Sequence, residues 1–125
     1  MTSSNTAHAA QIALGIYGEE LATRHLVAAG MRVVERNWRS RSGEIDVVAL
    51  DNTTLVICEV KTRTGDQFGG PLLAVDHRKL ARLRRLAGEW VAGHDIKFSS
   101  IRIDVIAITI PGRVPAILQH LQGVE

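Results

Sequence analysis

The chain has 125 residues, of which 46% are hydrophobic and 22% are charged, with 15 lysines and arginines against 13 aspartates and glutamates and only three prolines. This length and composition exclude a fibrous or wholly disordered chain and indicate a single domain, residues 1–125, that can bury its own core. The net charge of +2 does not by itself indicate a polyanionic partner, so the placement of the charges matters more than their sum.

A helix is predicted over residues 10–29. Residues 1–9 are small and polar, and we expect them to be flexible. The helix is indicated by apolar residues that recur at helical spacing without an interior proline, namely Leu14, Tyr17, Leu21, Leu26 and Val27. Gly30 supplies the stop, because glycine is favoured just past a helix C-terminus.

A β-hairpin is predicted at the centre of the chain. The stretch MRVVERNW has the composition of a strand, and residues 37–43 are typical of a polar loop. The runs EIDVVAL and TTLVICEVK then flank Asp51 and Asn52, which are favoured turn residues. We therefore expect these two runs to pair as antiparallel strands.

A second helix and a further strand complete the expected fold. Residues 63–71 predict a glycine-rich mobile loop, residues 74–92 an amphipathic helix, and IRIDVIAITI a strand, while PAILQHL fits either a short edge strand or a final turn. The order α-β-β-β-α-β indicates an α/β protein with one mixed central sheet flanked by helices. Two covered faces would explain why the central strands are apolar on both sides.

The compartment is indicated by the single cysteine and by the absence of targeting signals. Cys58 lies in the densest apolar stretch, where it resembles a small buried hydrophobic residue and implies a reducing, cytoplasmic setting. The N-terminus lacks a basic start and a signal-length apolar run, and no window approaches the ~20 apolar residues of a membrane span. We expect neither secretion nor membrane insertion.

Three charged residues interrupt the apolar hairpin: Asp46, Glu59 and Lys61. A buried charge costs several kcal/mol unless it is paired or bound to a metal. Because side chains alternate along a strand, Glu59 and Lys61 share a face. A two-residue loop at Asp51 and Asn52 places Asp46 diagonal to Glu59, and a loop that runs through Thr54 places it directly opposite. Both even-length loops predict one shared face, whereas a three-residue loop would separate Asp46 from the others.

Carboxylates on one face of adjacent strands favour a bound cation. Their Cβ atoms lie about 5 Å apart, so their charges repel unless a cation sits between them. Mg²⁺ suits such a site because it takes one or two carboxylates, waters and substrate phosphate, and we expect Mn²⁺ to substitute. Lys61 could orient or deprotonate an attacking water. Either Glu19 or Glu20 could add a carboxylate from the first helix, and periodicity does not choose between them.

Basic residues gather in two segments, MRVVERNWRSR and HRKLARLRRL. Such segregation favours contacts with phosphates, although a stripe on a helix is equally typical of an ordinary solvated face. The candidate nucleic-acid contacts are Arg39, Arg41, Arg63, Arg78, Arg82 and Arg85.

These residues resemble two known groups of proteins. Asp46, a twelve-residue spacer and EVK at 59–61 resemble the PD-(D/E)xK, or restriction-endonuclease-like, superfamily, although Ile45 stands where that superfamily often has proline. The strings GEELA, GMRVVERNWRSRSGEIDVVA and VICEVKTRTG are similar to the bacterial YraN-like family, which is considered distantly related to archaeal Holliday-junction resolvases. The likeness covers residues 14–104.

The resemblance implies a restriction-endonuclease-like fold and a Mg²⁺-dependent endonuclease that acts on DNA, including branched or damaged structures. By that resemblance Asp46, Glu59 and Lys61 fall on catalytic positions, with the two acids as metal ligands. Glu19 is implied as a further catalytic and metal-binding acid, because it precedes the helix-ending Gly30 by eleven residues. Junction resolution would also require a two-fold homodimer, since it needs two symmetric cuts.

Two other classes of function fit the same residues. One is a non-catalytic nucleic-acid-binding or DNA-processing accessory protein with this fold, and the other is a structural or partner-binding domain. Metal binding that depends on Asp46 distinguishes the nuclease from both, and salt-dependent DNA affinity distinguishes the first alternative from the second.

Overall fold

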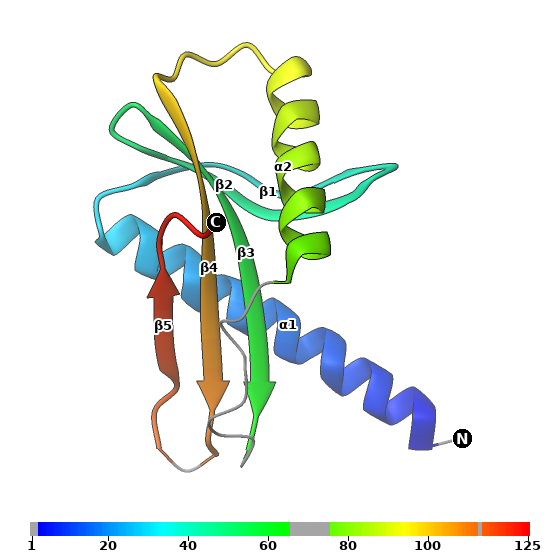
Figure 1. Ribbon diagram of the computed structural model, residues 1–125. Coiled ribbons are helices and arrows are strands. Elements are labelled where there is room, and N and C mark those ends of the chain that lie inside the picture. The colour runs from blue at the N-terminus through cyan, green and yellow to red at the C-terminus, as the bar shows by residue number, and fades with distance from the viewer. Residues whose placement is uncertain (1–2, 66–75, 113) are drawn as a thin grey trace.

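The fold is a five-stranded sheet between two helices (Figure 1). The structure, a computed structural model, describes residues 3–65, 76–112 and 114–125. Its elements in chain order are α1 (Ser3–Ala28), β1 (Arg32–Ser40), β2 (Gly43–Asp51), β3 (Thr54–Thr64), α2 (His77–Ala92), β4 (Ser100–Ile110) and β5 (Ile117–Leu121). The predicted α/β class and the α-β-β-β-α-β core are confirmed.

The sheet is mixed because one connection crosses over it. Its strand order is β1-β2-β3-β4-β5, with β3 and β4 parallel and all other neighbours antiparallel. Parallel neighbours need a crossover connection, and α2 belongs to the segment that joins β3 to β4. This connection brings the first turn of α2 beside β3.

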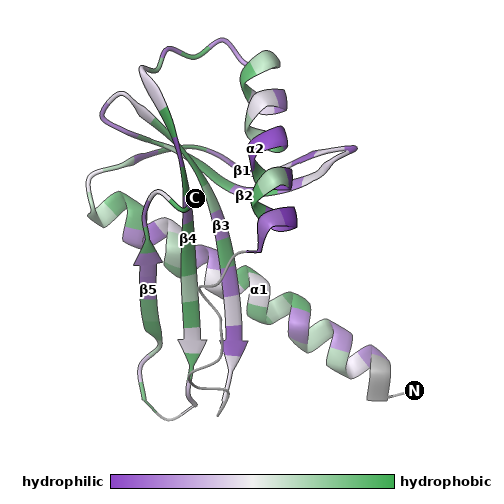
Figure 2. Cartoon of the chain, in the orientation of Figure 1, coloured by the Kyte–Doolittle hydropathy of each residue, from purple (hydrophilic) through white to green (hydrophobic). Residues whose placement is uncertain are grey.

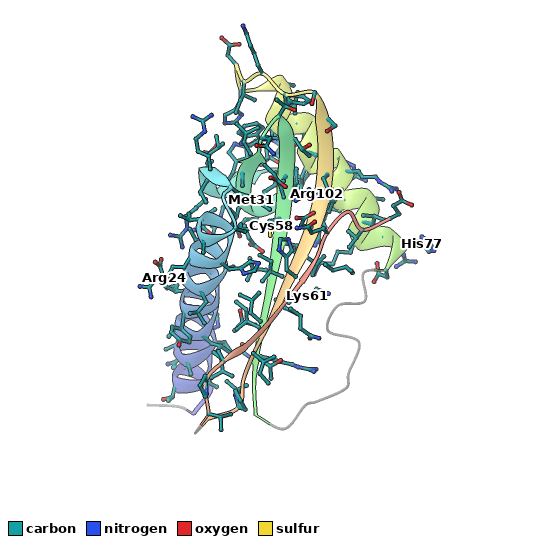
Figure 3. The ribbon with its side chains drawn as sticks, turned by 90° about the vertical axis from the view of Figure 1, so that its left-hand side faces the viewer. Arg24, Met31, Cys58, Lys61, His77 and Arg102 are labelled. Atoms are coloured by element: carbon teal, nitrogen blue, oxygen red, sulfur yellow. The ribbon has the colours of Figure 1, made fainter. Side chains whose placement is uncertain are left out.

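Two separate hydrophobic clusters hold the helices against the sheet. Alternate residues of β3 enter different clusters: Leu55 and Ile57 pack with α2 residues, whereas Val56 and Cys58 pack with α1 residues. Figure 3 shows the two helices on opposite sides of the sheet, and Figure 2 shows the hydrophobic middle of β4 between them. Both faces are covered as predicted, and Cys58 is buried.

Helix α1 is longer than the sequence predicted. It begins at Ser3 instead of residue 10, because residues 3–9 contain neither proline nor glycine and so carry no signal that breaks a helix. Gly30 has a φ of 92°, the left-handed conformation expected of a glycine just after a helix. In the parts of the chain that the structure describes, no helix is long and apolar enough to cross a membrane.

The predicted loop at residues 37–43 is wrong over most of its length. Strand β1 continues to Ser40 and β2 begins at Gly43, so only residues 41 and 42 separate the strands. The polar residues of this stretch are compatible with a strand because β1 lies at the edge of the sheet. Asn37 takes a φ of 55°, which asparagine tolerates better than most residues.

The boundaries around α2 are also revised. Residues 63 and 64, predicted as loop, belong to β3, and residues 66–71 of that predicted loop lie outside the described residues, as do residues 74 and 75 of the predicted helix. Helix α2 begins at His77, and the side chain of Asp76 caps it by accepting a 2.8 Å hydrogen bond from the Lys79 amide.

The last predicted segment forms an edge strand, β5, which a buried polar network fastens to the fold. Asp104 is fully buried and accepts two hydrogen bonds from Arg102, while its Oδ2 lies 2.8 Å from Nε2 of His120 on β5. Nδ1 of His120 in turn lies 3.0 Å from Nε2 of His25 on α1. These contacts satisfy the buried carboxylate and join α1, β4 and β5.

Candidate functional site

The candidate site begins where β2 and β3 diverge. Asp51 pairs with Thr54, so the loop has two residues, and the ladder then runs without a shift to Val47 opposite Cys58. This is the register in which Asp46 comes opposite Glu59. Beyond that pair β2 stays with β1 and β3 stays with β4. An even-length loop is confirmed, although it consists of Asn52 and Thr53, and of the two registers that the sequence left open the structure has the one that brings Asp46 opposite Glu59. The two acids lie at the first position after the ladder ends.

The side chain of Asp46 accepts a backbone hydrogen bond that the ladder between β2 and β3 no longer provides. Its Oδ2 accepts a 2.7 Å hydrogen bond from the backbone amide of Val60 on β3. A buried amide needs an acceptor, and here the carboxylate supplies one where the neighbouring strand has moved away. The conformation of Asp46 is therefore fixed by the divergence of the strands.

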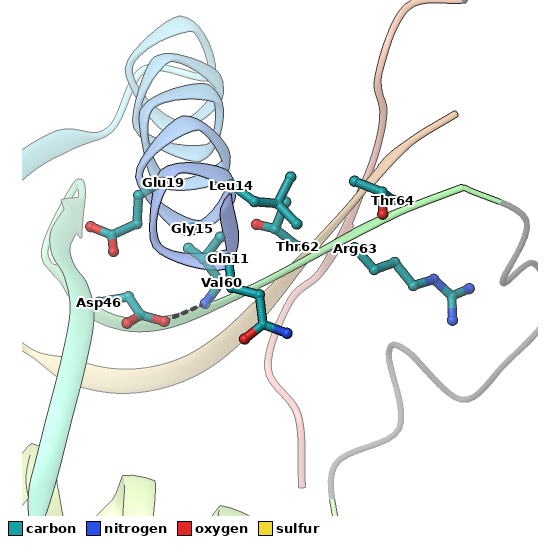
Figure 4. Close-up of a pocket in the computed structure, with 9 residues that line it drawn as sticks. All are labelled: Gln11, Leu14, Gly15, Glu19, Asp46, Val60, Thr62, Arg63 and Thr64. Carbon is teal, nitrogen blue, oxygen red and sulfur yellow. Dashed lines mark hydrogen bonds between the residues drawn. The ribbon is translucent and has the colours of Figure 1, made fainter. Parts of the chain in front are cut away.

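A pocket of about 500 Å³ opens on the α1 side of this divergence (Figure 4). Helix α1 and strand β3 form its walls, and Figure 4 shows the side chains of Glu19 and Asp46 beside each other. The lining residues are Gln11, Leu14, Gly15, Glu19, Asp46, Val60, Thr62, Arg63 and Thr64. The pocket thus brings together two of the predicted acids.

Glu59 lies on the other side of the sheet. It is almost fully buried, and its Oε2 forms an ion pair with Nζ of Lys79 in the first turn of α2. The expected single face for Asp46, Glu59 and Lys61 is therefore wrong, because the pleat no longer relates the two strands once they diverge. Asp46 and Glu59 nevertheless stay close enough for the charge of Glu59 to raise the pKa of Asp46.

The environment of Asp46 opposes its ionisation. The pKa of Asp46 is raised to about 7, chiefly by burial and also by the charges of Glu59, Glu19 and Glu44, while the hydrogen bond from Val60 acts in the opposite direction. Desolvation and like charges both disfavour a carboxylate. A cation in this position would remove both penalties.

Glu19, and not Glu20, faces the pocket. Burial raises the pKa of Glu19, with Arg36 and Asn37 acting in the opposite direction. Its Oε1 is buried without a hydrogen-bond partner among the described residues and lies 3.9 Å from Nη2 of Arg36. Glu20 instead forms ion pairs with Arg24 and Arg36, with its side chain 46% exposed.

Lys61 lies near the first turn of α2. Burial and the charge of Lys79 lower the pKa of the Lys61 ammonium, whereas Glu59 and Asp76 raise it. A lysine whose charged form is disfavoured is closer to the neutral form that can accept a proton. Lys61 is thus beside Glu59 and separated from the pocket that holds Glu19.

The basic candidates fall into three places. Arg78, Arg82 and Arg85 are exposed and line a groove on α2 together with Asp76 and Lys79. Arg39 forms a 3.6 Å ion pair with Glu44, and Arg41 is exposed in the turn between β1 and β2. Arg63 is at the rim of the pocket, where its Nε is buried and has no hydrogen-bond partner within the described part of the chain, and its guanidinium points away from Asp46 (Figure 4).

Two important residues escaped the sequence analysis as site residues. Lys79 contacts Glu59, and Arg36 contacts Glu19. Lys79 immediately follows Arg78 in a basic run. Its positive charge at the start of the helix that comes after the strand of Glu59 could have indicated the contact. No spacing in the sequence indicates the contact of Arg36, because it depends on how β1 crosses α1.

The acidic residues have the chemistry for a divalent cation. Asp46 with its raised pKa shares one pocket with Glu19, whose Oε1 accepts no hydrogen bond from the residues that the structure describes, and hard cations prefer carboxylate oxygens. Within residues 3–65, 76–112 and 114–125, however, no three histidine, cysteine, aspartate or glutamate side chains are grouped closely enough to hold a metal ion. A third carboxylate from Glu59 would first have to leave Lys79.

Fold and site together define an α/β protein with a mixed sheet between two helices, an acidic pocket under α1 and a basic groove on α2. The family model described as "Uncharacterised protein family UPF0102" matches residues 18–108. The chain is 56% identical over 117 residues to a UPF0102 protein of Kineococcus radiotolerans, covering 93% of this chain and 96% of that protein. It is 50% identical over 124 residues to one of a Nocardioides species, covering 99% of each. A third, from Mycobacterium avium, is 52% identical over 116 residues and covers 91% of each.

The chain therefore belongs to the UPF0102 family. This confirms the YraN-like part of the resemblance. Membership of the nuclease superfamily stays a prediction.

Proposed function

We propose that this protein is a metal-dependent nuclease that hydrolyses phosphodiester bonds in DNA. The observation that supports it best is the acidic pocket, which Asp46 and Glu19 line and where the charge of Glu59 also acts on the buried carboxyl of Asp46. Without a cation this cluster destabilises the fold, so its presence calls for a ligand of opposite charge. The basic groove on α2 supports a polyanionic substrate.

The proposed roles are those that the resemblance implies for each side chain. Asp46, Glu19 and Glu59 would hold Mg²⁺ or Mn²⁺. A bound ion of this kind polarises a phosphoryl oxygen and makes water more acidic. Lys61 would orient or deprotonate the water that attacks phosphorus, and the arginines of α2 would hold the flanking phosphates.

The test combines Mn²⁺ calorimetry with cleavage of single-stranded, duplex, flap and four-way-junction DNA. We expect Asp46→Asn and Glu19→Gln to lose cleavage and to weaken Mn²⁺ binding at least roughly tenfold, because each removes a ligand charge. Lys61→Ala should keep Mn²⁺ binding and lose about 10²–10⁴-fold in cleavage rate. Glu20→Gln is the matched control, since Glu20 neighbours Glu19 outside the pocket.

Cleavage that persists in Asp46→Asn and Lys61→Ala would refute the proposal. If four-way junctions are the substrate, we also expect a two-fold homodimer, which light scattering measures directly.

A non-catalytic DNA-binding accessory protein is the second candidate. It is favoured by the ion pair with Lys79, which occupies a carboxylate that catalysis would need. This candidate predicts salt-dependent DNA affinity that requires no metal and survives in Asp46→Asn.

A further inference from the structure

Lys79 is the residue that joins the acidic and basic parts of the molecule. Its Nζ forms an ion pair with Oε2 of Glu59, and the same side chain lines the α2 groove with Arg78, Arg82 and Arg85. The side chain of Lys79 is 28% exposed, whereas that of Glu59 is 12% exposed. Lys79 can therefore reach solvent, while Glu59 is confined to the interior.

The groove holds an excess of positive charge. Among its lining residues in the described part of the chain, Asp76 is the only acid, and its side chain accepts the amide hydrogen of Lys79 as a helix cap. Glu59, the ion-pair partner of Lys79, is thus a principal counter-charge for it. A phosphate entering the groove would compete with Glu59 for the same ammonium group.

Within the residues that the structure describes, the acidic pocket lacks a third carboxylate, and the carboxylate of Glu59 that could supply one is ion-paired with Lys79. Asp46 and Glu19 line the pocket, and no third acid joins them in a metal-binding group among the described residues. Glu59 is close enough to Asp46 to act on it electrostatically, but its charge is neutralised by Lys79. Release of this one ion pair would return a full negative charge to the divergence of β2 and β3.

We propose that Lys79 exchanges partners, from Glu59 in the free protein to a phosphate of a nucleic-acid strand in the α2 groove, and that this exchange frees Glu59 for the divalent cation. The inference rests on the proposed function, since it assigns both the cation and the polyanion to this chain. Its consequence is reciprocal: DNA tightens cation binding, and the cation tightens DNA binding by the same factor. Lys79 is a positioning residue in this scheme, because it acts through Glu59.

The test measures Mn²⁺ affinity by calorimetry without and with a phosphorothioate DNA oligonucleotide that resists cleavage. In the wild type, DNA should tighten Mn²⁺ binding by roughly fivefold or more. Lys79→Gln should bind Mn²⁺ roughly fivefold more tightly than the wild type without DNA and should gain little more when DNA is added. Arg78→Gln is the matched control, because it removes an equal charge from the same groove and leaves the Lys79–Glu59 pair in place.

The outcomes distinguish a failure of this inference alone from a failure of the proposed function. Equal effects of Lys79→Gln and Arg78→Gln on Mn²⁺ affinity would mean that only net charge matters and would overturn the role of Lys79, while the nuclease proposal would stand. If the wild type binds no Mn²⁺ with or without DNA, both proposals fail. Thermal unfolding of each variant without metal checks that the fold is retained.

Discussion

Asp46 is the residue on which the candidate site depends, and its ionisation is coupled to folding. Its pKa is raised to about 7 in the folded chain, against an ordinary value of 3.8. The native state therefore retains a proton that the unfolded state releases. The stability contributed by this proton is fully present below about pH 3.8 and is lost as the pH rises towards 7.

We predict that Asp46→Asn removes this pH dependence. Between pH 5 and pH 8, the free energy of unfolding of the wild type should fall by about 2–3 kcal/mol more than that of the variant. Urea unfolding in the presence of a chelator measures both. Asp95→Asn, which removes a charge at an exposed position, should show the same pH dependence of unfolding free energy as the wild type. The prediction would be contradicted if the unfolding free energies of the wild type and of Asp46→Asn changed in parallel with pH.

At the scale of single residues, the sequence predicted which side chains matter better than where they lie. The period of two along a strand correctly separated Cys58 from Glu59. The same period failed for Asp46, because the divergence of β2 from β3 is a property of the whole sheet. The contact between Lys79 and Glu59 could not be predicted from the sequence either, because it depends on where the crossover connection places α2 against the sheet.

At the scale of elements, the close crossing of α1 over β3 positions Glu19. A Cβ atom added at Gly18 would lie 1.8 Å from Oγ1 of Thr62, so the helix can approach the strand only because residue 18 has no side chain. In the sequence alone Gly15 and Gly18 are equivalent, because glycine weakens a helix interior at either position. Only the structure shows that Gly18 packs against β3 whereas, among the residues it describes, a side chain at Gly15 would enter open space.

We predict opposite effects of alanine at these two glycines. Gly18→Ala should lower the free energy of unfolding by about 1–3 kcal/mol, because the added methyl group forces α1 away from β3. Gly15→Ala should raise it by about 0.4–1 kcal/mol, since the added Cβ would meet no atom of the described residues within 4 Å apart from its chain neighbours and its own helix backbone, and alanine favours the helix. Denaturant unfolding measures both changes.

A compensating substitution tests the cause. Thr62→Ala removes the atom that the new methyl group would meet, so it should restore part of the stability of Gly18→Ala. If Gly18→Ala proves as stabilising as Gly15→Ala, the crossing is looser than the structure indicates.

The elements themselves were largely predictable. Apolar residues at helical spacing located both helices, although Tyr17 and Val27 of the first are exposed. β-Branched runs located the central strands. The predicted loop at residues 37–43 failed because edge strands tolerate the polar residues that also mark loops. The start of α1 failed for a related reason, because residues 5–9 are exposed and the sequence of residues 3–9 carries no apolar stripe.

At the scale of the whole molecule, the sheet separates two surfaces of different charge. The α1 side holds the acidic pocket, and the α2 side carries the basic groove. Lys79 and Glu59 connect them through the sheet edge where β2 has left β3. A polyanion bound at the groove would therefore lie next to the acids without having to contact them.

This arrangement predicts that DNA affinity depends on which side of α2 loses a charge. Arg82 lines the groove, whereas Arg84, two residues later, lines a separate cavity beside Gly123 and Val124. Arg82→Ala should reduce the slope of log affinity against log salt concentration by about 0.9, the value for one lost phosphate contact on a duplex. Arg84→Ala should leave the slope unchanged, although both variants have the same net charge. Fluorescence anisotropy over a salt series measures the slopes. Equal slopes for the two variants would show that DNA affinity depends on total charge and that the DNA strand does not lie in the groove on α2.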